Sequence, residues 1–115
     1  MGAEFSAQRI EPDLVWVDVR GEIDIRNARA LFTFAHQQIE GSPRMVLDLA
    51  SVEFFGAAGL SVFDELDERA SALNVRWAIL GGRPVQRLLR AADSAIAAKS
   101  YRTREGVLAA LARET

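Results

Sequence analysis

The sequence contains no cysteine and only one histidine, His36, and these two scarcities exclude several kinds of chemistry. Without cysteine the chain has no disulfide, no thiol nucleophile and no thiolate metal site. One histidine cannot form the histidine clusters that hold zinc within a single chain. The sequence also shows no nucleophile–base pair, so we expect no metal, no other cofactor and no enzymatic activity. His36 itself is expected at the surface, partly exposed and turned away from Phe32.

The chain also lacks a charge excess and a long apolar run. Fourteen Lys and Arg residues face sixteen Asp and Glu residues, for a formal net charge of −2. The chain therefore has no surplus of basic residues that would indicate a nucleic acid or an anionic membrane as its partner. No run approaches the ~20 apolar residues of a membrane span, and residues 1–13 lack the apolar core of a signal peptide. We expect a cytoplasmic protein, without membrane insertion, that forms one domain over residues 1–115.

What the sequence does contain is an alternation of apolar strands and amphipathic helices. Strands are predicted at residues 4–10, 14–19, 45–49, 52–55, 75–80 and 95–100. Helices are predicted between Asn27 and Gly41, from Gly59 to an inward-facing Leu73, from Pro84 to Ala92 and from Thr103 to Ala112. Asn27 is expected to cap its helix through its side chain, and Gly41 to end that helix in the left-handed conformation. The order predicts an α/β fold with a mixed, mostly parallel sheet of about five strands and about four helices.

The turn Gly56–Gly59 joins a strand to a helix, and this places a helix N-terminus beside the end of a strand. Open α/β sheets usually bind their ligands at such ends. The turn is not a P-loop, because no Lys-Ser or Lys-Thr follows it, and its two glycines do not complete the dinucleotide motif. Two interpretations stay open: a site for an anion or a partner, and a tight turn that only needs small residues.

Two further groups of charged residues are candidate functional sites. Glu22 and Asp24 are two residues apart in Gly21–Asp24, which is expected to end a strand and start a loop. Nothing supplies the second polar group that a catalytic pair needs, so a binding surface is favoured. Arg83, Arg87 and Arg90 have nearly helical spacing and predict a small basic patch, which is a weak indication of nucleic acid.

Three stretches resemble the STAS domain, the family of sulphate transporters and anti-sigma factor antagonists. LVWVDVRGEID, residues 14–24, is similar to the family's second strand and the Gly-Glu-hydrophobic-Asp loop after it. MVLDLASVEFFGAAGL, residues 45–60, resembles its next strand, extended segment and helix-opening turn. Val75–Leu88 resembles the strand and short helix that follow. The resemblance covers nearly the whole chain and implies the family's α/β fold.

The resemblance also implies a non-enzymatic protein-interaction module that acts in signalling and transcription regulation as an anti-sigma factor antagonist. Its partner would be an anti-sigma factor or a related GHKL-type kinase. In the family this partner phosphorylates a Ser or Thr immediately before the glycine of the turn, a position that matches Ala58 here. Ala57 replaces the preceding Ser, and Gly56 replaces an Asp. Alanine has no hydroxyl, so the phosphosite is degenerate; Ser51 and Ser61 are weak substitutes.

The partner-binding surface that the resemblance implies comprises Glu22, Asp24, Asn27, Phe55, Gly56, Ala57, Ala58, Gly59 and Leu60. Glu22 and Asp24 would accept hydrogen bonds from a basic partner, and Phe55 or Leu60 would provide an apolar anchor. Two alternatives remain. The turn at Gly56–Gly59 could instead hold a nucleotide or a lipid-like anion, or the domain could regulate a transporter. The chain is expected to be a monomer.

Overall fold

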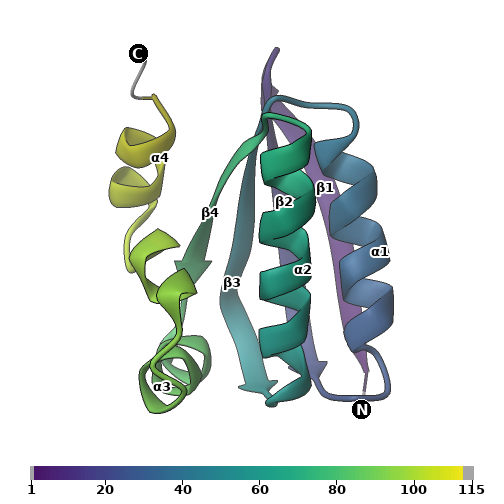
Figure 1. Ribbon diagram of the computed structural model, residues 1–115, viewed down its shortest axis with the longest axis vertical. Coiled ribbons are helices and arrows are strands. Elements are labelled where there is room, and N and C mark those ends of the chain that lie inside the picture. The colour runs from purple at the N-terminus through teal and green to yellow at the C-terminus, as the bar shows by residue number, and fades with distance from the viewer. Residues whose placement is uncertain (1, 113–115) are drawn as a thin grey trace.

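In the computed structural model, which describes residues 2–112, a five-stranded sheet carries helices on both faces (Figure 1). The strands are β1 (Ala3–Glu11), β2 (Leu14–Ile23), β3 (Arg44–Phe55), β4 (Arg76–Gly81) and β5 (Ser100–Tyr101). The helices are α1 (Ala28–Ile39), α2 (Ala58–Ala72), α3 (Arg83–Ala91) and α4 (Arg104–Ala112), with a 3-10 segment at Ala95–Lys99. The strands lie in the order β1-β2-β3-β4-β5. Only β1 and β2 pair antiparallel, so the predicted mixed, mostly parallel sheet is confirmed.

The central strands are apolar on both faces because both faces are covered. Alternate residues of a strand point to opposite faces. Val15 and Val17 of β2 therefore enter the larger core, whereas Leu14 and Trp16 enter the smaller one. A strand buried on two sides reads as a nearly continuous apolar run, as β2 does over Leu14–Val17.

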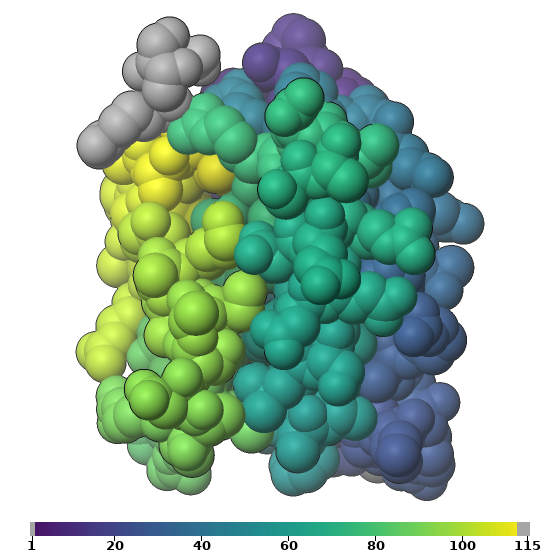
Figure 2. Space-filling model, viewed as in Figure 1, coloured from purple at the N-terminus to yellow at the C-terminus, as the bar shows by residue number. Residues whose placement is uncertain are grey.

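The larger core lies between the sheet and the helices α1, α2 and α3. The buried residues of α1 are Ala28, Leu31, Phe32, Ala35 and Ile39, and those of α2 are Gly59, Val62, Phe63, Leu66 and Ala70. Both sets recur at helical spacing, which turns one side of each helix to the sheet. In the space-filling view the side chains of these two helices close over this face (Figure 2).

The smaller core lies on the opposite face of the sheet, where α4 covers it. Val107 and Leu111 of α4 pack there with Leu14, Trp16, Val46, Ala78 and Leu80. The Oγ1 atom of Thr103 accepts a hydrogen bond from the Gly106 N–H at 2.9 Å, which confirms the predicted cap of this helix. Within the described part of the chain, no helix combines the length and the apolar character that crossing a membrane requires.

Several local predictions are wrong for physical reasons. The two strands predicted at 45–49 and 52–55 form the single strand β3, and β2 continues through Gly21 to Ile23 instead of ending. Gly21 has a φ of 99° and lies in a region where the register between β2 and β3 shifts. A glycine there lets both strands bend while pairing continues.

The predicted strand at 95–100 is mostly a 3-10 turn. Ser94 starts it by accepting a hydrogen bond from the N–H of Ile96 at 3.1 Å, and only Ser100 and Tyr101 pair with β4. The short alanine-rich segment has few large side chains to cover a sheet, which disfavours a longer strand.

The predicted ends of two helices also differ. Gly41 does not adopt the left-handed conformation, since the positive φ angles among residues 2–112 belong to Gly21, Asn74 and Asp93. Asn74, with a φ of 59°, turns the chain after α2. Leu73 therefore lies beyond the helix and is 48% exposed rather than inward-facing.

Candidate functional site

The candidate site lies where β2 and β3 end and where α1 and α2 begin, at the lower end of the molecule in Figure 1. Ile23 is paired with Phe55 in the sheet, and the N–H of Gly56 donates a hydrogen bond to the Ile23 carbonyl at 2.8 Å. These contacts bring the two predicted segments to one edge of the sheet. We call residues 22–27 and 54–60 the β2–β3 edge.

Asn27 braces the loop of this edge rather than capping the helix. It occupies the predicted N-cap position of α1, but its side chain makes no capping hydrogen bond. Its Oδ1 accepts from the N–H of Asp24 at 2.9 Å, and its Nδ2 donates to the Glu22 carbonyl at 2.9 Å. The side chain thus points back along the chain and satisfies the loop's own backbone.

Asp24 is already engaged by a neighbour, contrary to the expectation of a free acceptor. Its carboxylate accepts from the backbone N–H of Arg26 at 2.9 Å and from Nη2 of Arg26 at 2.7 Å. The hydrogen bond from the Arg26 side chain holds the pKa of the Asp24 carboxyl below its usual range. The Arg26 side chain is 74% exposed. The loop therefore presents a guanidinium together with the carboxylate, whereas Glu22 forms no ion pair within residues 2–112.

The turn at the start of α2 uses its own first N–H groups. The N–H of Gly59 donates to the Gly56 carbonyl at 2.9 Å, and that of Leu60 donates to the Ala57 carbonyl at 3.0 Å. Ala57 stands at the N-cap position, where it has no side chain that could cap. Two N–H groups that an anion would need are thus already bonded, which weakens the interpretation of this turn as an anion site.

Phe55 and Gly59 belong to the core. Phe55 is only 5% exposed and stacks on Phe63, with ring centroids 5.1 Å apart and planes inclined by 13°. Gly59 is buried beneath the Phe55 ring, and a Cβ atom at this position would overlap the ring. Of the two residues expected to provide an apolar anchor, Phe55 or Leu60, Phe55 is therefore buried in the core. Leu60 is half-buried against the larger core.

The exposed apolar side chains of the edge are Ile25 and Phe54, which sequence reasoning missed. Ile25 is 83% exposed and Phe54 is 52% exposed. The Phe54 ring covers Gly56, with Cε2 at 3.2 Å from where a Cβ of that glycine would be. One signal was available: neighbouring strand residues point to opposite faces, so only one of Phe54 and Phe55 could enter the larger core.

The alanines of the turn and the two serines differ in accessibility. Ala57 is exposed and Ala58 is half-buried, while Ser51 on β3 and Ser61 on α2 are both exposed. His36 is 22% exposed at its side chain, as expected, yet it stacks on the ring of Phe32 at 5.4 Å. That contact corrects the expectation for this histidine, because residues four apart share a helix face.

The comparisons with known proteins agree with this architecture. A model of the STAS domain matches residues 6–104. Osmosensory protein A of Mycobacterium tuberculosis is 36% identical over 69 residues, which are 60% of this chain, and the match spans 44% of that protein's length.

Two solved structures are similar over almost the whole chain. An anti-sigma factor antagonist from Mycobacterium paratuberculosis is 22% identical with a TM-score of 0.79, covering 97% of this chain and 96% of that one. The Bacillus anti-sigma factor antagonist SpoIIAA, in its unphosphorylated form, is 13% identical with a TM-score of 0.77, covering 97% and 99%. At these identities the likeness shows a shared fold.

Proposed function

This chain belongs to the STAS domain family, and on that basis we propose that it is a non-enzymatic protein-interaction module of the anti-sigma factor antagonist kind. Its partner is an anti-sigma factor or a related kinase, and its contact surface is the β2–β3 edge. The observation that carries the proposal is the exposure of Ile25 and Phe54 at this edge. Exposed large apolar side chains that lie near one another are typical of protein–protein contact sites.

The distribution of such side chains supports this edge over other surfaces. The large hydrophobic residues exposed among residues 2–112 are Ile25, Phe54 and Leu73. Leu73 follows the C-terminal end of α2. Ile25 and Phe54 instead lie two residues from Ile23 and Gly56, respectively, which are joined by a backbone hydrogen bond. Glu22 is the register partner of Phe54 and Arg26 follows Ile25, so each apolar side chain has a charged neighbour, as at the polar rim of an interface.

We further propose that the edge lacks the usual phosphorylation switch. The resemblance puts the phosphoacceptor at Ala58, in the first turn of α2. A phosphate would bring roughly −1.5 to −2 charges to this edge and oppose an apolar contact. Because alanine cannot form a phosphate ester, the edge keeps its unphosphorylated chemistry, and control passes to the amount of the protein or to the partner.

The test is binding to purified anti-sigma factors and related kinases encoded in the same genome, measured by biolayer interferometry. Ile25→Ser and Phe54→Ser are each expected to weaken binding by about tenfold or more, because truncating an interface anchor has effects of this size. Leu73→Ser is the control, since it removes an apolar side chain about as exposed as Phe54, at 48% against 52%, from another part of the surface. No binding to any candidate, or an equal loss in all three variants, contradicts the proposal.

A further inference from the structure

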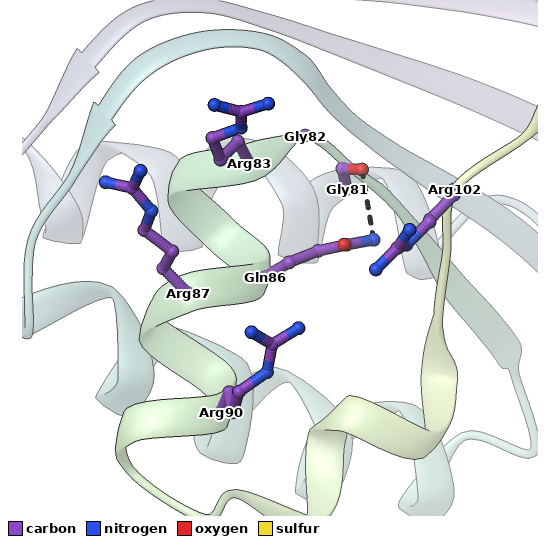
Figure 3. A pocket seen from close by; sticks show the side chains of 7 residues that line it. All are labelled: Gly81, Gly82, Arg83, Gln86, Arg87, Arg90 and Arg102. Carbon is purple, nitrogen blue, oxygen red and sulfur yellow. Dashed lines mark hydrogen bonds between the residues drawn. The ribbon is translucent and has the colours of Figure 1, made fainter.

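Four arginines surround one cavity of about 520 Å³ beside α3. Arg83, Arg87 and Arg90 come from α3, and Arg102 comes from the segment after β5. In Figure 3, Arg90 and Arg102 point toward each other from the two segments and Gln86 reaches toward Arg102, whereas the guanidinium groups of Arg83 and Arg87 point away from this pair. The sequence spacing indicated the three arginines of α3, but only the fold adds Arg102.

The fold holds the arginines at the cavity because α3 has two distinct sides. Val85 and Leu89 are buried in the larger core. The three arginines of α3 and Gln86 recur at helical spacing on another side, where they line the cavity. Burial of the apolar side therefore fixes the direction in which the basic side faces.

Among residues 2–112, no acidic side chain lines this cavity. Arg20, Arg26, Arg29 and Arg44 each pair with a carboxylate, but none of the four cavity arginines does so within residues 2–112. The chain as a whole has a net charge of −2, so this concentration of positive charge does not follow from composition. Asp93 lines an adjoining cavity of about 390 Å³ and pairs with none of them.

The remaining wall is backbone. Gly81 and Gly82 line the cavity at the start of α3, and the Gln86 amide donates to the Gly81 carbonyl at 3.4 Å. A Cβ at Gly82 would be 3.0 Å from the Ala50 carbonyl oxygen, so this wall is packed firmly against β3. The positive end of the nine-residue helix α3 adds to the field of the arginines.

We propose that this cavity binds a compact, soluble, phosphate-rich anion such as an oligophosphate. Guanidinium groups fit phosphate oxygens through paired hydrogen bonds, and Arg90 and Arg102, which point toward each other from two segments, can both reach one anion held between them. Within residues 2–112, no aromatic or aliphatic side chain lines this cavity, and the adjoining one adds only the aliphatic side chains of Leu89 and Ala97, so no aromatic ring is placed to stack on a nucleobase. The ligand is therefore recognised through its phosphates alone.

The test is titration of the protein with tripolyphosphate by calorimetry at about 150 mM salt, where unspecific surface attraction is largely screened. Saturable binding of one anion per chain is expected. Arg90→Gln and Arg102→Gln should each weaken it by about tenfold or more, the effect of losing a charge-assisted hydrogen bond. Arg69→Gln on α2 is the matched control: it removes the same charge from another exposed arginine and should leave binding unchanged. Melting temperatures verify that all three variants fold.

Several outcomes overturn the proposal. They are the absence of saturable binding, an equal loss in the control variant, and ATP binding more than tenfold tighter than tripolyphosphate, which would show recognition of the base. Tighter binding of a single-stranded oligonucleotide would assign the arginines to nucleic acid instead. Ile25→Ser and Phe54→Ser should bind tripolyphosphate normally, so this inference and the proposed function can fail separately.

Discussion

The ring of Phe55 occupies the space that any side chain at Gly59 would need. Phe55 is the last residue of β3 and Gly59 is the second residue of α2, so this contact fixes how the helix leaves the sheet. The same ring stacks on Phe63 one turn further along the helix. The geometry of the β2–β3 edge therefore depends on a glycine beneath an aromatic ring.

Gly59→Ala should lower the free energy of unfolding by about 1–3 kcal/mol, because the added methyl group overpacks the core. Chemical denaturation measures the change. Gly41→Ala is the control: the nearest atom to its Cβ would be 3.9 Å away, and it should change stability by less than about 0.5 kcal/mol. The double variant Phe55→Leu/Gly59→Ala should lose less than the sum of its single changes, because a smaller side chain makes room. If the losses in unfolding free energy of the two single variants simply add up in the double variant, the overlap between the Phe55 ring and a side chain at residue 59 is contradicted.

Ala58→Ser should create a phosphorylation site where the natural chain has none. After incubation with a partner kinase and ATP, intact-mass measurement is expected to show one phosphate on the variant and none on the unmodified chain. Ala109→Ser, on an exposed position of α4, is the control and should stay unmodified. A phosphate on Ser51 or Ser61 of the unmodified chain would show that the switch has moved rather than been lost.

Asp48→Ala should destabilise the protein by about 1–3 kcal/mol, the effect of leaving a buried donor without its acceptor. The Asp48 carboxylate accepts from the Trp16 indole N–H at 3.0 Å and from the Ala50 N–H at 3.0 Å. Asp18→Ala is the matched control, because Asp18 is paired with Asp48 across the sheet but bonds an exposed Arg20. Such a surface pair contributes little, so the control should remain within about 1 kcal/mol. An equal loss of stability in the Asp48→Ala and Asp18→Ala variants would contradict a stabilising role for the hydrogen bond from the Trp16 indole to Asp48.

Acid should remove a stabilising contact between Asp13 and Arg44. The Arg44 side chain donates a hydrogen bond to Asp13 and thereby lowers the pKa of this carboxyl. Because the folded pKa lies below the unfolded one, the stabilisation is complete above the ordinary value of about 3.9 and is lost as pH falls through the folded pKa. The melting temperature of Asp13→Asn should therefore lie below that of the natural chain at pH 7, and the difference should vanish in strong acid. A constant difference would contradict this origin.

Much of the fold could be predicted because the pattern is local. The apolar spacing of Leu31, Phe32, Ala35 and Ile39 indicates α1 without any tertiary information, and all four are buried. The hairpin of β1 and β2 follows from two strands joined by the turn at Pro12 and Asp13. What failed was the continuity of β2 and β3, since Gly21 and the register shifts beside it depend on pairing between distant segments.

The candidate site could be located but not described from the sequence. The turn Gly56–Gly59 follows from the order of strand, turn and helix, whereas Glu22, Asp24 and Asn27 join it through the resemblance to the STAS domain. Which of Phe54 and Phe55 is exposed depends on the phase of β3 relative to the two cores, which pairing with β2 sets. Arg102 joins the arginines of α3 only because β5 pairs with β4. Asn27 matched the expected position, yet its hydrogen bonds run toward the loop.

Those hydrogen bonds have a consequence for the rate and strength of association. The Asn27 side chain ties Glu22 to Asp24, and Asp24 holds Arg26, so the loop that carries Ile25 is bonded at both ends before any partner arrives. A segment ordered in advance loses little conformational entropy on complex formation. More of the contact energy then appears as affinity, and Asn27→Ala should weaken association although its own side chain faces inward to the loop.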